Sequence, residues 1–180
     1  MGTIRDPKSN AEAEKAKQLA LRYLTYQPRS RKEIVHRLRK EGFCASAVNR
    51  AVETLERLRL INDLELARRW IGVRMDTRPV GRRRASEELR RRGIPLEVVE
   101  QALDEAWKDL DPKDIAAGLL RKQARRYRNL EPGKAFRRMI GFLARRGFED
   151  ETVRSVVNAI WREWNEDDIE RDPRGFSEVL

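Results

Sequence analysis

The chain has 180 residues and a net charge of +10, with 39% charged, 39% hydrophobic and only 7% aromatic residues. Cys44 and His36 are the only residues of their types, which excludes an intrachain disulfide and a structural zinc site of about four thiolate or imidazole ligands. No apolar run approaches the roughly 18 residues of a membrane span, and no signal-peptide stretch opens the chain. We therefore expect a cytoplasmic protein that has no membrane partner, no metal and no cofactor.

Three helical repeats follow one another along the chain. We expect a tail over residues 1–15, repeats over residues 16–63, 64–110 and 111–164, and an acidic tail over residues 165–180. Each repeat opens with apolar residues at helical intervals, which predicts a helix. These opening helices are expected over Ala16 to Tyr26, Leu64 to Met75 and Ile115 to Tyr127.

The fold class predicted from these patterns is all-α. No alternating run bounded by Asn-Gly or Asp-Gly turns indicates a strand. A repeat of roughly 50 residues buries too little apolar surface to be stable alone, so we expect each repeat to stack on its neighbour. We predict an elongated, curved array of three tandem three-helix repeats, and we expect it to be a monomer.

A glycine motif recurs in the three repeats, at Gly42, Gly93 and Gly147. A leucine stands four residues before each glycine, and a hydrophobic residue follows it directly. This spacing is typical of the Schellman motif, in which a glycine at C′ is left-handed and the residue at C″ folds back onto C3. The motif recurs after 51 and then 54 residues. We expect each glycine to end a helix.

Basic residues concentrate in the repeats, because residues 165–180 hold six acidic and only two basic side chains. A basic field favours a polyanion such as nucleic acid, although a merely solvated charged surface is the alternative. The densest cluster lies in the second repeat. Its members are Arg74, Arg78, Arg82, Arg83, Arg84, Arg90, Arg91 and Arg92.

Helix stability explains part of this cluster. Arg91 and Arg92 are expected in the last turn before Gly93, where positive charge complements the helix dipole. Residues 82–84 are expected near the start of the same helix, where positive charge is unfavourable. We therefore regard these three arginines as the best candidates for contact with an anion or an acidic partner.

A second basic cluster lies in the third repeat. Spacing places Arg121, Arg125 and Arg128 on one face of the predicted helix, with Arg126 beside them. Arginine makes bidentate contacts with phosphate and carboxylate alike, so this face could bind DNA or an acidic protein surface. Base readout is not expected, because the repeats lack a helix that mixes Asn, Gln or Ser with arginine and have few aromatic platforms.

The sequence does not favour catalysis. A Ser/His or Cys/His nucleophile would depend on His36, which lies in a stretch rich in lysine and arginine. Acidic residues that could hold magnesium for a nuclease are expected where helices begin, and capping explains them more simply. They are Asp63, Glu65, Asp109, Asp111 and Asp114.

A distinctive set of residues spans the second repeat. It comprises Asn62, Asp63, Leu66, Ala67, Trp70, Ile71, Arg74, Gly81, Arg84, Glu88, Leu89, Arg92, Gly93 and Ile94. This set resembles the central motif of the RecX regulatory proteins, except that Leu66 stands where an aromatic residue is more usual. Tyr23 to Leu55 resembles the first repeat of that family, and Ala135 to Ile160 resembles its third, so the resemblance covers most of the chain.

The resemblance implies a modulator of the RecA recombinase. Members of the family consist of tandem three-helix repeats, bind along the groove of the RecA filament on DNA, and mostly inhibit strand exchange, ATP hydrolysis and the coprotease activity behind the SOS response. It implies the RecA filament as partner, with weak binding to single- or double-stranded DNA that is not sequence-specific. The residues leave open whether RecA is inhibited or stabilised.

Two other classes of function stay open. The first is a free-standing DNA-binding protein, because Ser30 to Leu38, Gly42 and Ala47 to Leu58 also resemble a helix-turn-helix reader. Such a reader would bind DNA without RecA and with a marked sequence preference. The second is a DNA-repair nuclease, whose magnesium-dependent cleavage would require a carboxylate such as Asp63.

Overall fold

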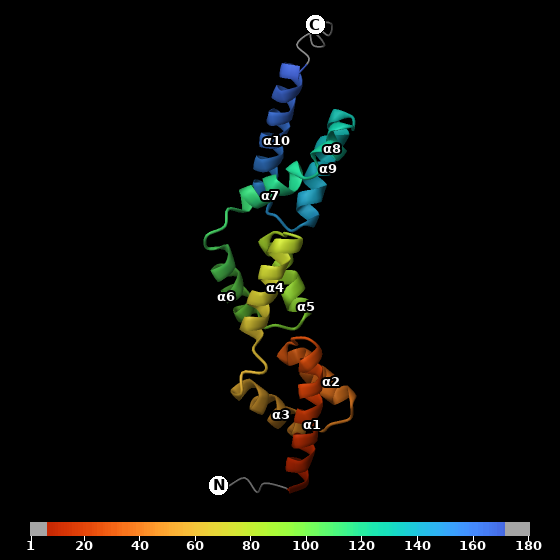
Figure 1. The fold of residues 1–180 in the computed structure, drawn as a ribbon, viewed down its shortest axis with the longest axis vertical. Helices are drawn as coiled ribbons and strands as arrows, with labels where there is room; N and C mark the ends of the chain where they lie inside the picture. Colours follow the sequence, from red (N-terminus) through yellow and green to blue (C-terminus); the bar gives the residue numbers. More distant parts are fainter. Residues whose placement is uncertain (1–6, 172–180) are drawn as a thin grey trace. The chain divides into compact units, whose positions relative to one another are not determined.

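The computed structural model describes the backbone of residues 7–171 and the side chains of residues 10–123 and 126–164. Over residues 7–171 it contains ten helices and no strand, which confirms the all-α class. The helices are α1 (Pro7–Tyr26), α2 (Arg31–Lys40), α3 (Ala45–Arg57), α4 (Asp63–Thr77), α5 (Arg82–Arg91), α6 (Leu96–Trp107), α7 (Pro112–Arg121), α8 (Ala124–Arg128), α9 (Pro132–Arg145) and α10 (Asp150–Arg171) (Figure 1).

The described residues form two compact units. The first unit comprises the chain up to Val73 together with Ser86–Ala106, and the second comprises Arg74–Ala85 together with the chain from Trp107 onward. The division between them falls within α4 and within α5.

In the first unit, α1, α2 and α3 pack against one another (Figure 1). The inner face of α3 follows from apolar residues at helical spacing, and Val48, Val52 and Leu55 are fully buried. Ala16 and Ala20 lie one turn apart on α1 and are also fully buried. Their short side chains allow α1 and α3 to approach closely. These residues form the core of this part of the chain.

In the second unit, α10 packs against α7 and α9, and α8 packs against α9. Leu120, Met139 and Leu143 are fully buried in its core. At the edge of this core the ring of Phe136 meets that of Trp161 edge-on, with centroids 5.7 Å apart. The core holds α9 and α10 in place, and the loop between these helices contains the third glycine motif.

The predicted Schellman motif is confirmed in all three repeats. The φ angles of Gly42, Gly93 and Gly147 are +89°, +81° and +80°. In each copy the N–H of the residue after the glycine donates to the carbonyl oxygen of the leucine, at 3.3–3.4 Å. The glycine N–H in turn donates to the carbonyl oxygen three residues earlier, at 2.8–3.0 Å. Three helices therefore end in the same way, and their last turns have the same geometry.

Some boundaries differ from those expected. The opening helix of the first repeat begins at Pro7 rather than Ala16, so part of the expected tail is helical. The helix expected over Ile115 to Tyr127 is two helices, because residues 122 and 123 form a turn between α7 and α8. The last helix, α10, continues to Arg171, and residues 172–180 of the expected acidic tail lie outside the described residues.

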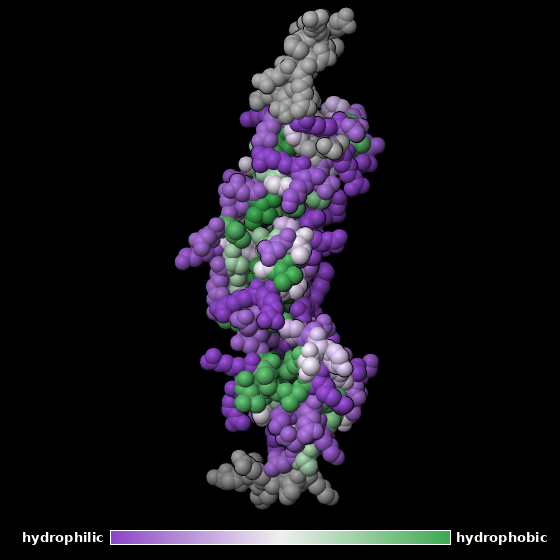
Figure 2. Space-filling view, in the orientation of Figure 1, coloured by the Kyte–Doolittle hydropathy of each residue, from purple (hydrophilic) through white to green (hydrophobic). Residues whose placement is uncertain are grey.

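Most of the face seen in Figure 2 is hydrophilic, with smaller apolar areas between the charged side chains. Among the described side chains, that of Tyr26, at the end of α1, is the most exposed large apolar one. Within the described residues, no helix combines the length and the apolar composition that a membrane crossing requires.

Candidate functional site

Two of the contacts between helix ends join the N-terminus of one helix to the C-terminus of another, and we call them the first and second joints. In the first joint (Pro28, Ser30, Glu33, Arg92 and Gly93), the N-terminus of α2 meets the C-terminus of α5. The Ser30 hydroxyl accepts from the Glu33 N–H at 3.1 Å and donates to the Arg92 carbonyl at 2.5 Å. The Glu33 carboxylate accepts from the Ser30 N–H, which completes a capping box.

The Arg92 side chain connects the two helix ends of the first joint by hydrogen bonds. Its Nε and Nη2 each donate to a carboxylate oxygen of Glu33 at 3.2 Å, and Nη2 also donates to the Pro28 carbonyl at 3.1 Å. Both side chains are about three-quarters buried, so the two-point contact is partly shielded from solvent. Arg92 is therefore a structural residue of this joint rather than a freely exposed one.

In the second joint (Pro79, Gly81, Arg84, Arg146 and Gly147), the N-terminus of α5 meets the C-terminus of α9. The Gly81 N–H donates to the Arg146 carbonyl at 2.8 Å, and Arg146 Nη1 donates to the Pro79 carbonyl at 2.8 Å. Pro79, Gly81 and Arg84 stand 51 residues after Pro28, Ser30 and Glu33, and Arg146 stands 54 residues after Arg92. The second joint therefore repeats the first at equivalent positions.

The arginines at the start of α5 have structural partners in this joint. Arg84 Nη1 donates to the Arg145 carbonyl at 2.8 Å, and Arg83 Nη2 donates to the Ala144 carbonyl at 3.1 Å. These acceptors belong to the last turn of α9, whose carbonyls lie beyond the regular i to i+4 bonding of the helix and carry the negative end of the dipole. Arg83 and Arg84 therefore have a structural role that their own helix does not reveal, because their cationic groups contact the C-terminus of a different helix. Their contact with an anion or an acidic partner stays a prediction.

The second joint is strongly basic around Arg146. This side chain is half-buried and lies over the ring of Phe142, with 5.1 Å from guanidinium carbon to ring centroid. Burial, and then the positive charges of Arg74, Arg84 and Arg78, lower the pKa of the Arg146 guanidinium. Arg146 is not among the site residues predicted from the sequence, although alignment of the repeats pairs it with Arg92.

The other arginines of the second repeat differ in exposure. Arg78, Arg83, Arg90 and Arg91 are exposed, whereas Arg74, Arg82, Arg84 and Arg92 are half-buried. Arg91 lies 3.9 Å from a carboxylate oxygen of Glu87 on the same helix, a weak and solvated pair. Arg74, Arg78, Arg83 and Arg84 belong to the second unit, while Arg90, Arg91 and Arg92 belong to the first.

The second basic cluster does not form the single face that spacing predicted. The turn between α7 and α8 separates Arg121 from Arg126 and Arg128, and the side chain of Arg125 lies outside the described residues. Arg121 pairs with Glu163 of α10 at 2.6 Å. Arg128 stacks over the ring of Trp164 at 5.4 Å, and Arg126 is exposed.

Two of the acidic residues considered for a nuclease accept hydrogen bonds from backbone N–H groups at the starts of helices. Asp111 is the N-cap of α7 and accepts from the Lys113 N–H at 2.7 Å, as capping predicts. Asp63 accepts from the Arg31 N–H at the start of α2, at 2.8 Å. Among the described residues, no three His, Cys, Asp or Glu side chains form a group that could hold a metal ion.

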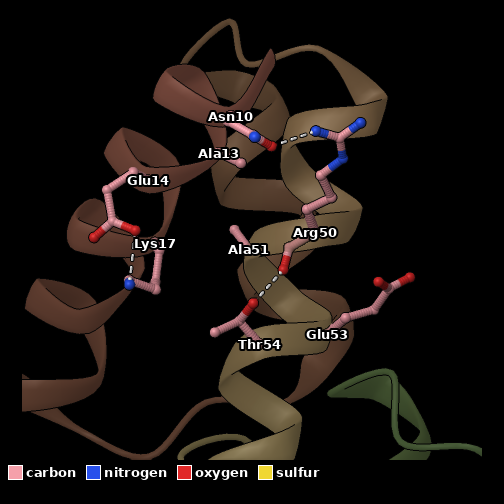
Figure 3. A pocket seen from close by; sticks show the side chains of 8 residues that line it. All are labelled: Asn10, Ala13, Glu14, Lys17, Arg50, Ala51, Glu53 and Thr54. Carbon is pink, nitrogen blue, oxygen red and sulfur yellow. Dashed lines mark hydrogen bonds and ion pairs between the residues drawn. The ribbon is translucent and has the colours of Figure 1, made fainter. Parts of the chain in front are cut away.

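A groove of about 600 Å³ lies between α1 and α3 (Figure 3). Arg50 Nη1 donates to Asn10 Oδ1 at 2.7 Å, and Lys17 pairs with Glu14 at 2.7 Å. The cations that line this groove thus have partners inside it, and the predicted arginines are not among the lining residues. Those residues are Asn10, Ala13, Glu14, Lys17, Arg50, Ala51, Glu53 and Thr54.

The fold and the two joints define an all-α protein of tandem three-helix domains with a basic surface. Comparison with known families gives three successive matches, to the first, second and third three-helix domains of RecX, over residues 16–55, 62–103 and 111–157. The chain therefore belongs to the RecX family.

Individual relatives agree with this assignment. The chain is 32% identical to the regulatory protein RecX of Amycolatopsis mediterranei, over 83% of this chain and 85% of the relative. It is 34% identical to that of Mycolicibacterium smegmatis, over 85% and 82%. The crystal structure of RecX from Lactobacillus salivarius matches with a TM-score of 0.75 and 25% identity, over 83% of this chain and 97% of that one.

Proposed function

We propose that this protein binds the RecA filament on DNA and inhibits the recombinase, ATPase and coprotease activities of RecA in DNA repair and the SOS response. The observation that carries the proposal is the match of all three RecX domains in order along the chain. A regulator that acts by occupying a filament needs no catalytic group of its own. We propose that it acts as a monomer in the cytoplasm.

Charge supports a filament on DNA as the target. The net charge is +10, and the exposed arginines include Arg78, Arg83 and Arg90. Cations on a protein surface gain affinity for nucleic acid by releasing counterions from the phosphates. This contribution does not depend on base sequence, so affinity for naked DNA is expected to be weak and unspecific.

The experiment that tests this function is RecA-catalysed, single-stranded-DNA-dependent ATP hydrolysis, with this protein added at amounts well below those of RecA. Loss of hydrolysis at such ratios, with little binding to naked DNA in the same salt, would support filament regulation. Inhibition that begins only when the protein coats the DNA would mean competition for phosphates, and the proposal would fail. Faster or longer-lived hydrolysis would mean that the protein stabilises the filament instead.

A free-standing helix-turn-helix protein is the second candidate. The observation that favours it is the connection of α2 to α3 through residues 41–44, a short turn that contains Gly42. The side chains of α3 argue against this candidate. The exposed Glu53 places a negative charge beside Arg57, and Arg50 is already hydrogen-bonded to Asn10. Strong preference for one duplex sequence, in the absence of RecA, would favour this candidate over filament regulation.

A further inference from the structure

A groove runs beside α4 in the first unit, next to the segment that connects α1 to α2. Two hollows, of about 120 and 490 Å³, adjoin one another there, because both are lined by Pro28, Arg29, Leu66 and Arg69. Every residue that lines them belongs to the first unit. We call this continuous hollow the α4 groove.

The α4 side of this groove is an apolar stripe. Leu66, Trp70 and Val73 follow one another at intervals of four and three residues, which places them on one face of the helix. Leu66 is buried, Trp70 is half-buried and Val73 is 58% exposed. Towards the other end of the groove, Leu60 is 48% exposed. A partner that covers these side chains removes apolar surface from water, which favours binding.

Three arginines also line the groove, namely Arg29, Arg59 and Arg69. None of them makes an ion pair with a carboxylate of the described residues. The guanidinium of Arg29 donates to the amide oxygen of Gln27, which is a neutral group. The groove therefore combines an apolar stripe with cations that have no counter-charge within hydrogen-bond distance.

The backbone of Arg59 is strained. Its φ is +56°, and no other residue with a Cβ has a positive φ in the described part of the chain. Gly42, Gly93 and Gly147 occupy the same C′ position in the other motifs. A left-handed conformation costs an arginine free energy that a glycine would avoid, and strain of this kind is typical of functional positions. The cation that Arg59 brings to the groove is such a function.

We infer that the α4 groove docks an acidic segment of a partner protein, in which an apolar side chain stands among carboxylates. The apolar side chain packs against Trp70 and Val73, and the carboxylates pair with Arg59 and Arg69. Arginine suits this role because its guanidinium forms two parallel hydrogen bonds with one carboxylate. An amphipathic segment that lies in a groove is a recurring mode of peptide recognition.

The lining of the groove favours a protein segment over nucleic acid. Glu65 lines one of the hollows, and Glu33, which also lines the groove, forms an ion pair with Arg92. A nucleic-acid strand carries one negative charge per nucleotide, and these two carboxylates repel it. A protein segment can instead place a neutral residue opposite each carboxylate.

A second copy of this chain fits the groove less well. A two-fold contact between copies places the same surface on both sides of the interface. Arg29, Arg59 and Arg69 of one copy would then face the same arginines of the other. Like charges across an interface are unfavourable, so the groove matches a partner of opposite charge.

The test uses random dodecapeptides displayed on phage and selected on the immobilised protein. The selected peptides are labelled with fluorescein, and their affinity is measured by fluorescence anisotropy over a range of salt concentrations. We expect them to combine leucine, phenylalanine or tryptophan with several aspartates or glutamates. Their affinity should fall as salt is raised, because salt screens the contacts with the arginines.

Arg59→Gly is the key variant, because it removes a cation from the groove and also relieves the left-handed backbone. We expect the affinity for the selected peptides to fall by about tenfold while the fold becomes more stable, so unfolding cannot explain the loss. Val73→Ser tests the apolar stripe at an exposed position and should weaken binding by about fivefold.

Arg57→Gly and Leu96→Ser are the matched controls. Arg57 carries the same charge two residues before Arg59, and Leu96 is 51% exposed on the same unit. Neither residue lines the groove. Each control should lose less than about twofold in affinity.

Several outcomes would overturn the inference. They include equal losses in Arg59→Gly and Arg57→Gly, a selection that enriches no peptide, and enriched peptides without acidic residues. Oligothymidylate that displaces the peptides, and that binds more weakly to Arg59→Gly and Val73→Ser, would make nucleic acid the occupant. A dimer in analytical ultracentrifugation that Val73→Ser abolishes would make a second copy the occupant.

The inference goes beyond the proposed function, because peptide binding is measured without RecA or DNA. If Arg59→Gly loses both the peptides and the inhibition of RecA, the groove contributes to contact with the filament and both proposals are supported. If the unmodified protein binds peptides through the groove but leaves RecA unaffected, the inference stands and the proposed function fails. Inhibition of RecA by a protein that binds no peptide would mean the reverse.

Discussion

The N–H of Gly81 donates to the carbonyl oxygen of Arg146 at 2.8 Å, so the start of α5 approaches the end of α9 backbone to backbone. A Cβ on Gly81 would lie only 2.2 Å from the carbonyl oxygen of Gly147. We therefore expect Gly81→Ala to force the two helix ends apart and to lower the free energy of unfolding by about 1–3 kcal/mol. Urea denaturation followed by circular dichroism measures this loss.

Gly118→Ala is the matched control for this substitution. Gly118 lies inside α7 of the same unit, and an added Cβ would have no heavy atom within 4 Å apart from its chain neighbours and the backbone of its own helix. Alanine is the better helix former, so this variant should gain about 0.5–1 kcal/mol. Equal effects of the two substitutions would contradict the close approach at the second joint.

Removal of the charge on Glu33 should weaken the first joint. Glutamine can still accept the Ser30 N–H of the capping box, but its bond to Arg92 is no longer charge-assisted. Because the pair is partly exposed to solvent, we expect Glu33→Gln to cost only about 1 kcal/mol. Glu53→Gln, at an exposed position of α3, should be nearly neutral.

The salt dependence of thermal unfolding provides a further check on this pair. Screening weakens an ion pair, so the difference between Glu33→Gln and the unmodified protein should shrink in about 1 M salt. A difference that persists unchanged in high salt would mean that shape, rather than charge, makes Glu33 important.

Arg59 is a position where glycine should stabilise the protein. Its φ is +56°, and the Leu60 N–H donates to the Leu55 carbonyl at 2.9 Å, so α3 ends in a Schellman motif with arginine at C′. A left-handed conformation costs a residue with a Cβ about 1–2 kcal/mol. Arg59→Gly should therefore raise the free energy of unfolding by about 1 kcal/mol in chemical denaturation.

Arg57→Gly is the appropriate control for Arg59→Gly. It removes the same charge at the last residue of α3, where the backbone is helical, and should cost about 1 kcal/mol. A loss of stability in both variants would show that the side chain of Arg59 contributes more to stability than the relief of its left-handed φ angle.

The stability of the first unit should depend on the protonation of Asp63. Burial raises the pKa of this carboxyl more than the hydrogen bond from the Arg31 N–H lowers it, and Glu56 raises it further. At pH values just above the ordinary pKa of 3.8, the folded chain therefore holds the Asp63 proton more tightly than the unfolded chain does. The contribution of Asp63 to stability is present at low pH and is lost as pH rises through the folded-state pKa.

Asp63→Asn tests this sign, because asparagine does not titrate and its carbonyl can still accept from the Arg31 N–H. The stability of the variant relative to the unmodified protein should increase as pH rises from about 4 to about 7, in thermal unfolding at several pH values. A relative stability that falls over this range would mean that the Asp63 carboxylate is favourable in the folded state.

Local patterns in the sequence were sufficient to predict three of the helix C-termini. A glycine that follows a leucine by four residues and precedes a hydrophobe determines a C-terminal motif within a few residues, without help from the rest of the chain. Gly42, Gly93 and Gly147 conform to it. The break at residues 122 and 123 was not predicted, because apolar residues on both sides of it continue at helical intervals.

The role of each arginine could not be read from its own helix. By sequence alone, Arg83 and Arg84 lie at an unfavourable helix N-terminus, and Arg92 and Arg146 lie at favourable C-termini. The structure places Arg84 against the last carbonyls of α9, 61 residues away, and Arg92 against Glu33, 59 residues away. Electrostatic contacts act through space, so spacing along one helix cannot identify such partners.

The sequence by itself determined the all-α class, the three repeats, their glycine-terminated helices and the resemblance to RecX, because each depends on short-range periodicity or on a pattern of residue types. Only the tertiary structure decided which helix ends meet, that Arg92 is neutralised by Glu33, and that Arg84 and Arg146 share one basic joint. The physical reason is that helix termini carry unsatisfied backbone N–H and C=O groups. Tertiary packing, rather than neighbours in the sequence, determines which groups become their partners.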